Sequence, residues 1–343
     1  MAPVTNAPVL VTGPTGYIGA HVALNLLQHG YSVRGTVRSQ EKFDQLLAQP
    51  AFQQYKDKFT AVIVEDLVTG DFTEAVKGVD VVVHTASPFK VTPENPEETY
   101  LKPAIQGTKG VIEAAIKSGT VKNIVITSSF AAIVSPQDGV PFNERLYTES
   151  DWNSSTYEEA VKSDTPGFAY RVSKKVAEQT ANELVKGKPI KLAAINPPLV
   201  LGPYVHAVAK LDDLNESLAQ LWAALSGRKG KDLPPTGTPA VADVRDLADA
   251  HRLAFEKDQE GRFIVYNGPF DWAQLVDIAR RDFPEQAENT PEPKDSDRVS
   301  TNPKVFHLDS TKSKEVLGLK YHTVEQTLHD TIEQLYAEHA EGK

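Results

Sequence analysis

Tyrosine, lysine and serine residues at chemically useful spacing give the first indication of an activity. Tyr170 and Lys174 stand four residues apart, and Ser128 and Ser129 occur upstream of them. Reduction of a carbonyl requires a proton at the oxygen as hydride reaches the carbon, and a free phenol with a pKa near ~10 gives up its proton reluctantly. A cation one helical turn away favours the phenolate and lowers that pKa. Lys174 suits this role, and a serine hydroxyl can orient the substrate oxygen.

These side chains act together only if helices and strands bring them to one place, because Tyr-x-x-x-Lys pairs alone are common on exposed helices. Residues 164–166, Asp-Thr-Pro, are typical of a helix start, and the following helix carries Tyr170 and Lys174 on one face. Residues 123–129 form an apolar strand that ends in hydroxyls. Because open α/β sheets bind ligands at the carboxyl ends of their strands, the serines and the Tyr/Lys pair are expected to meet there.

A glycine-rich turn near the start of the chain predicts a dinucleotide site. Residues 9–12 are apolar, three glycines follow at intervals of three, and residues 18–27 have the periodicity of an amphipathic helix. Such a strand–turn–helix aims backbone N–H groups at a phosphate. The spacing is G-x-x-G-x-x-G instead of G-x-G-x-x-G, and an ordinary glycine turn is the alternative. The expected cofactor contacts in this turn are Gly13, Thr15, Gly16, Tyr17, Ile18 and Gly19.

The residue after the second predicted strand indicates which dinucleotide binds. About 20 residues past the glycine turn, an NAD enzyme places an acid on the ribose 2′-hydroxyl, whereas an arginine accommodates a 2′-phosphate. Arg38 stands there and no acid occurs before Glu41, so NADP(H) is favoured, with Lys42 as a second phosphate ligand. The alternative is a solvated arginine at a helix entry. Asp66, after the third predicted strand, is a candidate adenine contact, although acidic residues after strands often serve turns.

The remaining periodicity predicts an α/β fold: a Rossmann-type doubly wound parallel sheet with a smaller C-terminal substrate-binding domain. Residues 79–87 form an apolar run typical of a strand buried on both faces, with small residues at its end and His84 interpreted as a core histidine. Strand and helix alternate regularly until about residue 200. We therefore predict an NADP-binding domain from residues 1–198 with 240–258 returning to it, and a substrate-binding domain from 199–239 and 259–343.

Composition excludes several other classes of protein. The chain has 343 residues, a net charge of −10 and no cysteine. Nucleic-acid binding needs a basic face, and no apolar run approaches the ~20 residues that span a bilayer, so neither partner is expected. Absence of cysteine removes disulfides, zinc–thiolate sites and thiol catalysis, and no metal is expected. The first residues lack the pattern of a secretory signal, so a cytoplasmic location is expected.

Taken together, these motifs resemble the extended short-chain dehydrogenases/reductases, in the dihydroflavonol-reductase-like branch. Within that branch the chain is most similar to fungal NADPH-dependent methylglyoxal and aldehyde–ketone reductases. The resemblance extends over nearly the whole chain. The matching motifs are Gly13-Pro-Thr-Gly16-Tyr-Ile-Gly19, Arg38-Ser-Gln-Glu-Lys42, His84-Thr-Ala-Ser-Pro-Phe89, Thr127-Ser-Ser129, Tyr170-x-x-x-Lys174, Asn196-Pro-Pro-x-x-x-Gly-Pro203 and Asp243-Val-Arg-Asp-Leu-Ala-x-Ala-His251.

The resemblance implies roles residue by residue. Ser129, Tyr170 and Lys174 are the catalytic residues, Arg38 binds the 2′-phosphate, and Pro197 lies on the nicotinamide side. The other expected cofactor contacts are Leu67, Thr85, Ala86, Ser87, Thr127, Tyr170, Lys174 and Leu199. The expected substrate pocket consists of Phe89, Ser129, Phe130, Tyr170, Pro198, Leu199 and Val241. Relatives often carry Asn where this chain has Gln106, so the resemblance does not extend to a four-residue proton relay.

The implied activity is NADPH-dependent reduction of small aldehydes and ketones to alcohols by a monomer or homodimer. An apolar pocket favours small aldehydes, 2-oxoaldehydes, keto esters or aryl ketones. One alternative on the same fold is a nucleotide-sugar epimerase or a steroid dehydrogenase/isomerase, although an epimerase keeps NAD bound and prefers an acid at the position of Arg38. A non-enzymatic NADP sensor is a further alternative, but such proteins usually lose the Tyr/Lys pair.

Overall fold

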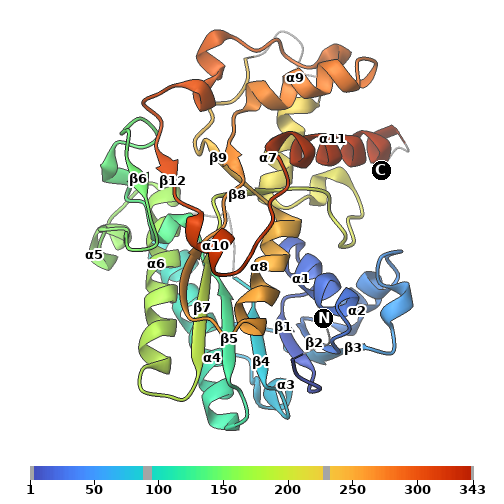
Figure 1. The fold of residues 1–343 in the computed structure, drawn as a ribbon, viewed down its shortest axis with the longest axis vertical. Helices are drawn as coiled ribbons and strands as arrows, with labels where there is room; N and C mark the ends of the chain where they lie inside the picture. The colour runs from blue at the N-terminus through green and yellow to red at the C-terminus, as the bar shows by residue number, and fades with distance from the viewer. Residues whose placement is uncertain (1–3, 88–94, 227–231, 341–343) are drawn as a thin grey trace.

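The computed structural model describes residues 4–87, 95–226 and 232–340, which form a large parallel sheet with helices on both faces and a smaller layer above it (Figure 1). The sheet has seven strands in the order β10-β7-β5-β4-β1-β2-β3. Every neighbouring pair is parallel. The order reverses between β1 and β4, so the prediction of a doubly wound Rossmann-type sheet is confirmed. The strands are β1 (Val9–Thr12), β2 (Val33–Val37), β3 (Phe59–Ile63), β4 (Val81–His84), β5 (Asn123–Thr127), β7 (Lys191–Asn196) and β10 (Gly261–Ile264).

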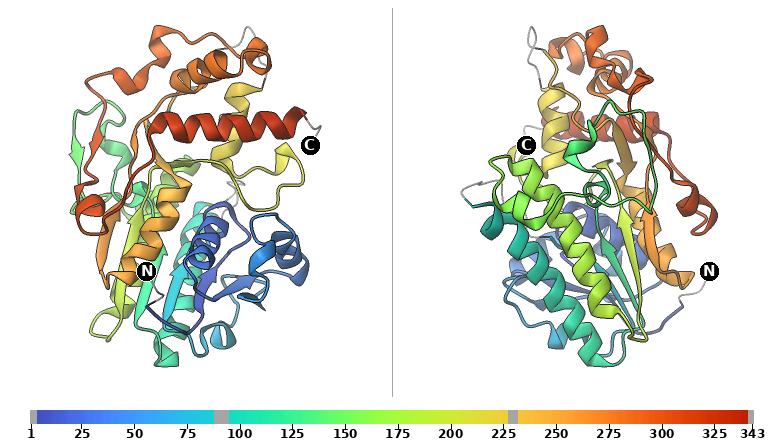
Figure 2. Two further views of the ribbon diagram at one scale, coloured as in Figure 1. Left: turned by 45° about the vertical axis from the view of Figure 1, so that its right-hand side comes forward. Right: turned by 90° about the vertical axis from the view of Figure 1, so that its left-hand side faces the viewer.

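Alternate residues of the central strands supply two separate cores. On β1, Val9 and Val11 pack in the core that includes α1 and α8, whereas Leu10 packs in the core that includes α4. Helix α1 packs against α8, and α4 packs against α6 on the opposite face (Figure 2). The helices around the sheet are α1 (Tyr17–Gln28), α2 (Gln40–Leu47), α3 (Thr73–Val76), α4 (Lys102–Ser118), α6 (Pro166–Val185) and α8 (Val244–Glu256).

A second unit lies over the carboxyl ends of the strands (Figures 1 and 2). Its small sheet has the order β11-β9-β8, and a separate two-stranded pair joins β12 to β6. These strands are β6 (Leu146–Tyr147), β8 (Leu199–Leu201), β9 (Ala240–Asp243), β11 (Gly268–Pro269) and β12 (His307–Leu308). The accompanying helices are α5 (Tyr157–Val161), α7 (Glu216–Leu225), α9 (Trp272–Asp282), α10 (Thr311–Glu315) and α11 (Val324–Ala340).

The chain crosses between the units more often than its periodicity indicates. Strand β10 belongs to the large sheet, although the predicted division places residues 259–343 in the substrate-binding domain. Strand β6, within the range 1–198, pairs instead with β12 of the second unit. Strand β9 lies in the range 240–258 that was predicted to return to the NADP-binding domain, but it pairs with β8 and β11 of the second unit. The predicted boundaries therefore differ from the strand pairing at these three places, because short strands pair with partners far away in sequence.

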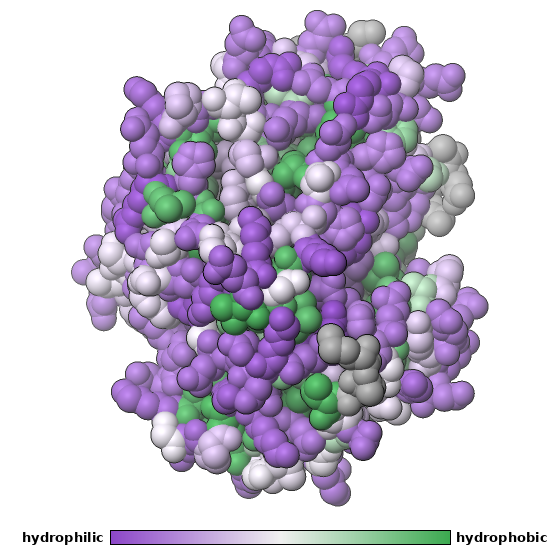
Figure 3. Space-filling model, in the orientation of Figure 1, coloured by the Kyte–Doolittle hydropathy of each residue, from purple (hydrophilic) through white to green (hydrophobic). Residues whose placement is uncertain are grey.

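The surface in Figure 3 is mostly hydrophilic, and hydrophobic residues appear there in small separate groups. Across the described ranges, none of the helices combines the length and the hydropathy that crossing a bilayer requires.

Candidate active site

Helix α6 and the end of β5 bring the three expected catalytic side chains together. Tyr170 and Lys174 lie one turn apart on α6, and Ser129 is the second residue after β5. The Tyr170 and Ser129 side chains share a hydrogen bond. The Lys174 Nζ atom lies 5.6 Å from the centre of the Tyr170 ring. The phenol, the serine hydroxyl and the ammonium group therefore line one cavity.

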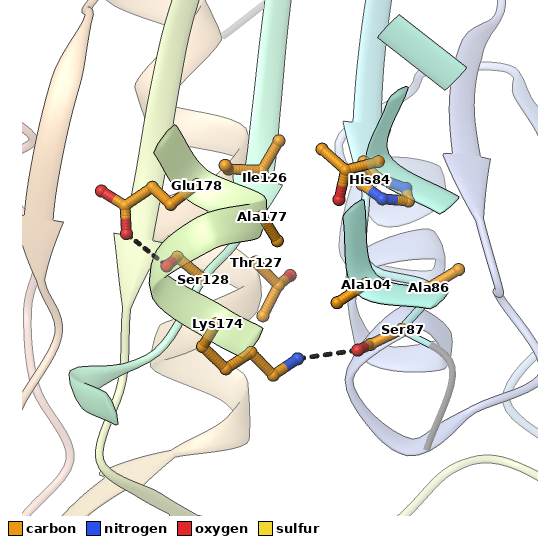
Figure 4. A pocket seen from close by; sticks show the side chains of 11 residues that line it. His84, Ala86, Ser87, Ala104, Ile126, Thr127, Ser128, Lys174, Ala177 and Glu178 are labelled. Carbon is orange, nitrogen blue, oxygen red and sulfur yellow. Dashed lines mark hydrogen bonds between the residues drawn. The ribbon is translucent and has the colours of Figure 1, made fainter. Parts of the chain in front are cut away.

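Burial acts on the phenol and the ammonium in opposite directions. Loss of solvation raises the pKa of Tyr170, although the Ser129 hydrogen bond and the charge of Arg171 oppose this shift. Burial lowers the pKa of Lys174 to about 8. The sequence predicts a lowered pKa for Tyr170, but in the structure this pKa is raised, because desolvation outweighs the nearby charges. The Lys174 Nζ atom donates to Ser87 Oγ at 2.7 Å (Figure 4).

The two adjacent serines have different surroundings. Ser128 is buried, and its hydroxyl donates to the Glu178 carboxylate (Figure 4). Ser129 is half-buried, and its Oγ atom accepts a hydrogen bond from the backbone N–H of Ala131 at 3.1 Å. Because Ser129 also bonds to Tyr170, it is the serine that faces the phenol.

The glycine turn is compact because its three glycines have no Cβ. Gly13 has a φ of +67°, a conformation that glycine adopts without steric cost. A Cβ at Gly19 would lie 2.1 Å from the Gly13 carbonyl oxygen and 2.7 Å from Thr85 Oγ1. Gly16 is the N-cap residue of α1. Helix α1 therefore starts at the cavity, and its first backbone N–H groups, which have no hydrogen-bond partner within the helix, lie there.

A cavity of about 920 Å³ extends from this glycine turn to the three expected catalytic side chains. It contains polar groups at both ends and lies along the carboxyl ends of the parallel strands, where this fold class binds ligands. The expected cofactor contacts that line it are Gly13, Thr15, Gly16, Tyr17, Ile18, Gly19, Arg38, Lys42, Leu67, Thr85, Ala86, Ser87, Thr127, Tyr170, Lys174, Pro197 and Leu199.

Two cations mark the end of the cavity that adjoins β2 and α2. Arg38 and Lys42 both line it and are both exposed. Ser39 caps α2, since its hydroxyl accepts a hydrogen bond from the backbone N–H of Lys42 at 3.3 Å. The positive end of the α2 dipole therefore adds to the two side-chain charges.

Asp66, expected as an adenine contact, is not among the residues that line the cavity. Its Oδ1 atom accepts from the backbone N–H groups of Val68 and Thr69 at 2.6 and 2.9 Å. The bonds from Thr69 and Val68 hold the pKa of this exposed carboxyl below its ordinary value. The carboxylate therefore stabilises a turn, which is the alternative that the sequence offered.

The substrate end of the cavity contains most of the expected pocket residues. Ser129, Phe130, Tyr170, Pro198 and Leu199 line it. Val241 instead is fully buried within β9, where it pairs with β8 and β11, and it is not among the residues that line the cavity. Phe89 lies outside the described residues.

Several polar residues at this end were not expected from the sequence. Arg171 follows Tyr170 on α6 and lines the cavity. Its place next to Tyr170 in the sequence is the feature from which this position could have been predicted. Glu216 and Gln220 come from α7, in a segment whose sequence carries no motif, so only the tertiary fold shows their placement. Further lining residues are Ala131, Gly167, Asn215, Ser217 and Thr238.

Two buried histidines support the strands but are uncharged at neutral pH. His84 Nδ1 is 2.7 Å from Thr12 Oγ1, and His251 Nε2 is 2.7 Å from Thr127 Oγ1. Burial lowers the pKa of each histidine to about 4. The interpretation of His84 as a core histidine agrees with this geometry. Gln106 is exposed on α4 and does not line the cavity.

The residues present fit a phosphorylated dinucleotide. A helix N-terminus and close-packed glycines suit a pyrophosphate, and Arg38 with Lys42 suits an additional phosphate at one end. At the other end, Tyr170 and Lys174 offer a phenol and an ammonium beside a half-buried serine.

Comparison with known proteins places the chain in a family with this fold. Residues 9–267 match the model of the NAD dependent epimerase/dehydratase family. The chain is 43% identical to the oxidoreductase C513.07 of Schizosaccharomyces pombe, over 98% of each protein. It is 34% identical to the NADPH-dependent methylglyoxal reductase GRE2 of Saccharomyces cerevisiae, over 95% of this chain and 97% of that protein.

The solved structures agree with the sequence matches. The crystal structure of yeast methylglyoxal/isovaleraldehyde reductase Gre2 complexed with NADPH superposes with a TM-score of 0.87. The two proteins are 31% identical, and the match covers 97% of this chain and 99% of Gre2. The fold and site define a dinucleotide-binding protein of the oxidoreductase class. The chain belongs to the NAD dependent epimerase/dehydratase family, and the predicted resemblance is confirmed.

Replacement of Arg38 by Ala tests the cation at the end of the cavity. We expect the KM for NADPH to rise about 10- to 100-fold, because hydrogen bonds to charged groups contribute ~1.5–3 kcal/mol, while the KM for NADH changes less than about twofold. Arg34→Ala is the matched control, since this arginine of β2 donates to the carbonyl oxygens of Ala75 and Lys77. Equal changes for the two cofactors in Arg38→Ala would contradict a 2′-phosphate contact.

The depressed pKa of Lys174 predicts a pH dependence. With a pKa of about 8, the side chain is charged at pH 7 and becomes neutral as the pH rises through 8. We expect kcat/KM for NADPH, which reports groups of the free enzyme, to be level near neutrality and to fall above about pH 8. Stopped-flow or steady-state measurements in a constant-ionic-strength buffer series test this. A profile that stays flat to pH 10 would show that the ammonium charge is not needed.

Proposed function

We propose that this protein reduces small aldehydes and ketones to alcohols with NADPH. The observation that supports this proposal most strongly is the hydrogen bond between Tyr170 and Ser129. Tyr170 lies one helical turn from Lys174, and the cavity that these residues line also reaches Arg38. Relatives that share more than 90% of its length are NADPH-dependent methylglyoxal reductases by name, which supports the same cofactor and reaction class here.

Tyr170 serves as the proton donor. Because burial raises its pKa, the phenol stays protonated at neutral pH and holds a proton ready for the substrate oxygen. NADPH, when bound, supplies the hydride that converts the carbonyl carbon to an alcohol carbon. Ser129 holds the substrate oxygen by a hydrogen bond, and Tyr170 transfers its proton as negative charge develops on that oxygen. The Lys174 charge lowers the energy of the phenolate that remains.

Arg171 and Glu216 narrow the class of substrate. Arg171 lines the cavity beside Tyr170, and burial lowers the pKa of its guanidinium. Within the described part of the chain, no carboxylate forms an ion pair with it, so its N–H groups are available to a substrate oxygen. Glu216 also lines the cavity, where it accepts from Gln220 Nε2 at 3.1 Å, and its charge repels an anionic substrate. A neutral dicarbonyl, such as a 2-oxoaldehyde or a keto ester, satisfies both groups.

The epimerase alternative is less well supported by the residues. An epimerase on this fold retains NAD and prefers an acid near the ribose, whereas Arg38 and Lys42 line this end of the cavity. We also propose a cytoplasmic location, in keeping with a sequence that contains no cysteine. A monomeric or homodimeric state is part of the same proposal.

Loss of NADPH absorbance in the presence of a carbonyl panel tests the proposed function directly. The panel contains methylglyoxal, a keto ester, an aryl ketone and a branched aliphatic aldehyde, and chiral analysis identifies the products. Stoichiometric NADPH oxidation with alcohol formation is expected. Tightly retained NAD with no net cofactor consumption would support the epimerase instead.

Replacement of Tyr170 by Phe removes the proposed proton donor while preserving the ring. We expect kcat to fall by about 10²–10⁴-fold, the usual contribution of general acid catalysis, with the NADPH Kd changed less than about threefold. Tyr157→Phe is the matched control, because its hydroxyl donates to Glu97 Oε1 and it does not line the cavity. Turnover by Tyr170→Phe at the level of the control would remove Tyr170 from the mechanism.

Replacement of Arg171 by Leu tests the proposed substrate class. We expect kcat/KM for a dicarbonyl to fall about tenfold, because this partly exposed guanidinium loses a charge-assisted hydrogen bond, while a monocarbonyl aldehyde changes less than about twofold. The aldehyde serves as an internal control for folding and cofactor binding. Equal losses for both substrates would show that Arg171 does not recognise a second carbonyl oxygen.

A further inference from the structure

Helix α6 carries a third side chain in line with Tyr170 and Lys174. Glu178 lies one turn beyond Lys174 and two turns beyond Tyr170, so the three residues share one face of the helix. The Glu178 side chain is buried, with 1% of the residue exposed. A carboxylate is removed from water at such a position only when charged or polar partners surround it.

Three residues from three different strands or strand ends satisfy this carboxylate. Arg262 of β10 donates from Nε to Glu178 Oε1 at 2.5 Å and from Nη2 to Glu178 Oε2 at 3.4 Å. The Asn196 Nδ2 atom at the end of β7 donates to Oε2 at 2.9 Å. The Ser128 hydroxyl, after β5, donates to Oε2 as well (Figure 4). Glu178 therefore ties α6 to the carboxyl ends of β5 and β7 and to β10.

Asn196 extends this network to the residue that bonds to the phenol. Its Nδ2 atom donates to the Ser129 carbonyl oxygen at 3.2 Å as well as to Glu178. Its Oδ1 atom is buried and has no hydrogen-bond partner among the described residues, so the two donated bonds determine how the amide lies. One amide group thus connects the Glu178 carboxylate with the backbone of Ser129.

Glu178 and Lys174 also line a second, small cavity. This cavity of about 30 Å³ has Ser87, His84 and Ser128 on its wall as well (Figure 4). Arg262 also donates to the Glu149 carbonyl oxygen at 3.0 Å and stacks on the Trp152 ring, with its Cζ atom 3.8 Å from the ring centre. The network is therefore continuous from the loop at 149–152 to the Tyr170 helix.

A buried ion pair is a weak source of net stability, because desolvation of both charges offsets their attraction. It does fix geometry, since each bond restricts the position of a different element. The catalytic hydrogen bond between Tyr170 and Ser129 joins two of those elements, α6 and the turn after β5. Its geometry depends on how these elements are held, and displacement of reacting groups by about 1 Å can reduce a rate ~10²-fold.

We propose that Glu178 is a positioning residue for carbonyl reduction, which holds the Ser129 turn at bonding distance from Tyr170 through Ser128 and Asn196. This inference rests on the proposed reductase function. Glu178 does not touch the substrate. It acts through the turn that carries Ser129, so its loss lowers the rate of the chemical step more than it weakens NADPH binding.

Glu178→Gln is the decisive variant, because it keeps the size of the side chain and removes its charge. We expect kcat to fall about tenfold or more, while the NADPH Kd from fluorescence titration changes less than about threefold. The isotope effect on kcat with NADPH deuterated at the transferred position should increase, because hydride transfer becomes slower relative to product release. Lower stability alone would change neither readout well below the melting temperature.

Glu256→Gln is the matched control. Glu256 Oε2 accepts a hydrogen bond from Arg252 Nη1 at 2.6 Å. The Glu256 side chain is 11% exposed and the Arg252 side chain is 8% exposed. This pair on α8 lies outside the lining of the cavity. We expect Glu256→Gln to lower Tm and to leave kcat and the isotope effect at the wild-type values.

Asn196→Ala provides an independent test if Glu178→Gln does not fold. It breaks the connection to Ser129 but leaves Glu178 paired with Arg262, and kcat should again fall with NADPH binding retained. Where both variants fold, the double variant should be no slower than Glu178→Gln alone, because Asn196 is one of the two links through which Glu178 acts. Wild-type kcat in Asn196→Ala, or in folded Glu178→Gln, would overturn the proposal. Failure of the wild-type protein to reduce any carbonyl would instead overturn the proposed function.

Discussion

The carboxyl ends of the parallel strands meet at one edge of the sheet, and this constraint brings together every group of the candidate site. Side chains separated by more than a hundred residues come close together because β1, β4, β5 and β7 are consecutive strands in the order of the sheet. The reversal of strand order between β1 and β4 opens a crevice at that edge, since the crossover connections leave in opposite directions. The glycine turn occupies one side of the crevice, and α6 presents Tyr170 on the other.

Helix α6 is the element whose register matters most. A slip of one residue along an α-helix moves each side chain by ~1.5 Å and rotates it by ~100°, which would separate Tyr170 from Ser129. Van der Waals packing does not by itself specify register strongly, whereas the bonds from Arg262, Asn196 and Ser128 to Glu178 form in only one register. The network thus fixes the register of α6, although its net contribution to the stability of the fold is small.

The sequence predicts the elements of this site better than its connections. Apolar β-branched runs identify the central strands, and the Gly13–Gly19 spacing identifies the turn, because each signal is local. The pairing of Glu178 with Arg262 could not be predicted in this way, because a single acid on a helix and a single arginine on a strand are usually solvated. The two residues meet only because β10 pairs with β7 in the large sheet. Val241 is expected in the pocket from similarity to relatives alone, and in the structure it is fully buried and not among the residues that line the cavity. Asp66 is ambiguous from sequence, and local backbone N–H groups decide its role.

Desolvation explains why a phenol and an ammonium work as a pair at neutral pH. Burial disfavours both charged forms, so it raises the pKa of Tyr170 and lowers that of Lys174. The phenol therefore retains the proton that a reductase must deliver, and the ammonium retains its charge only up to about pH 8. In the proposed reaction an alkoxide takes the phenol proton, and the new phenolate lies in the same poorly solvated space as the Lys174 charge, where their attraction is stronger than in water. The environment that holds the proton before reaction thus also favours its transfer.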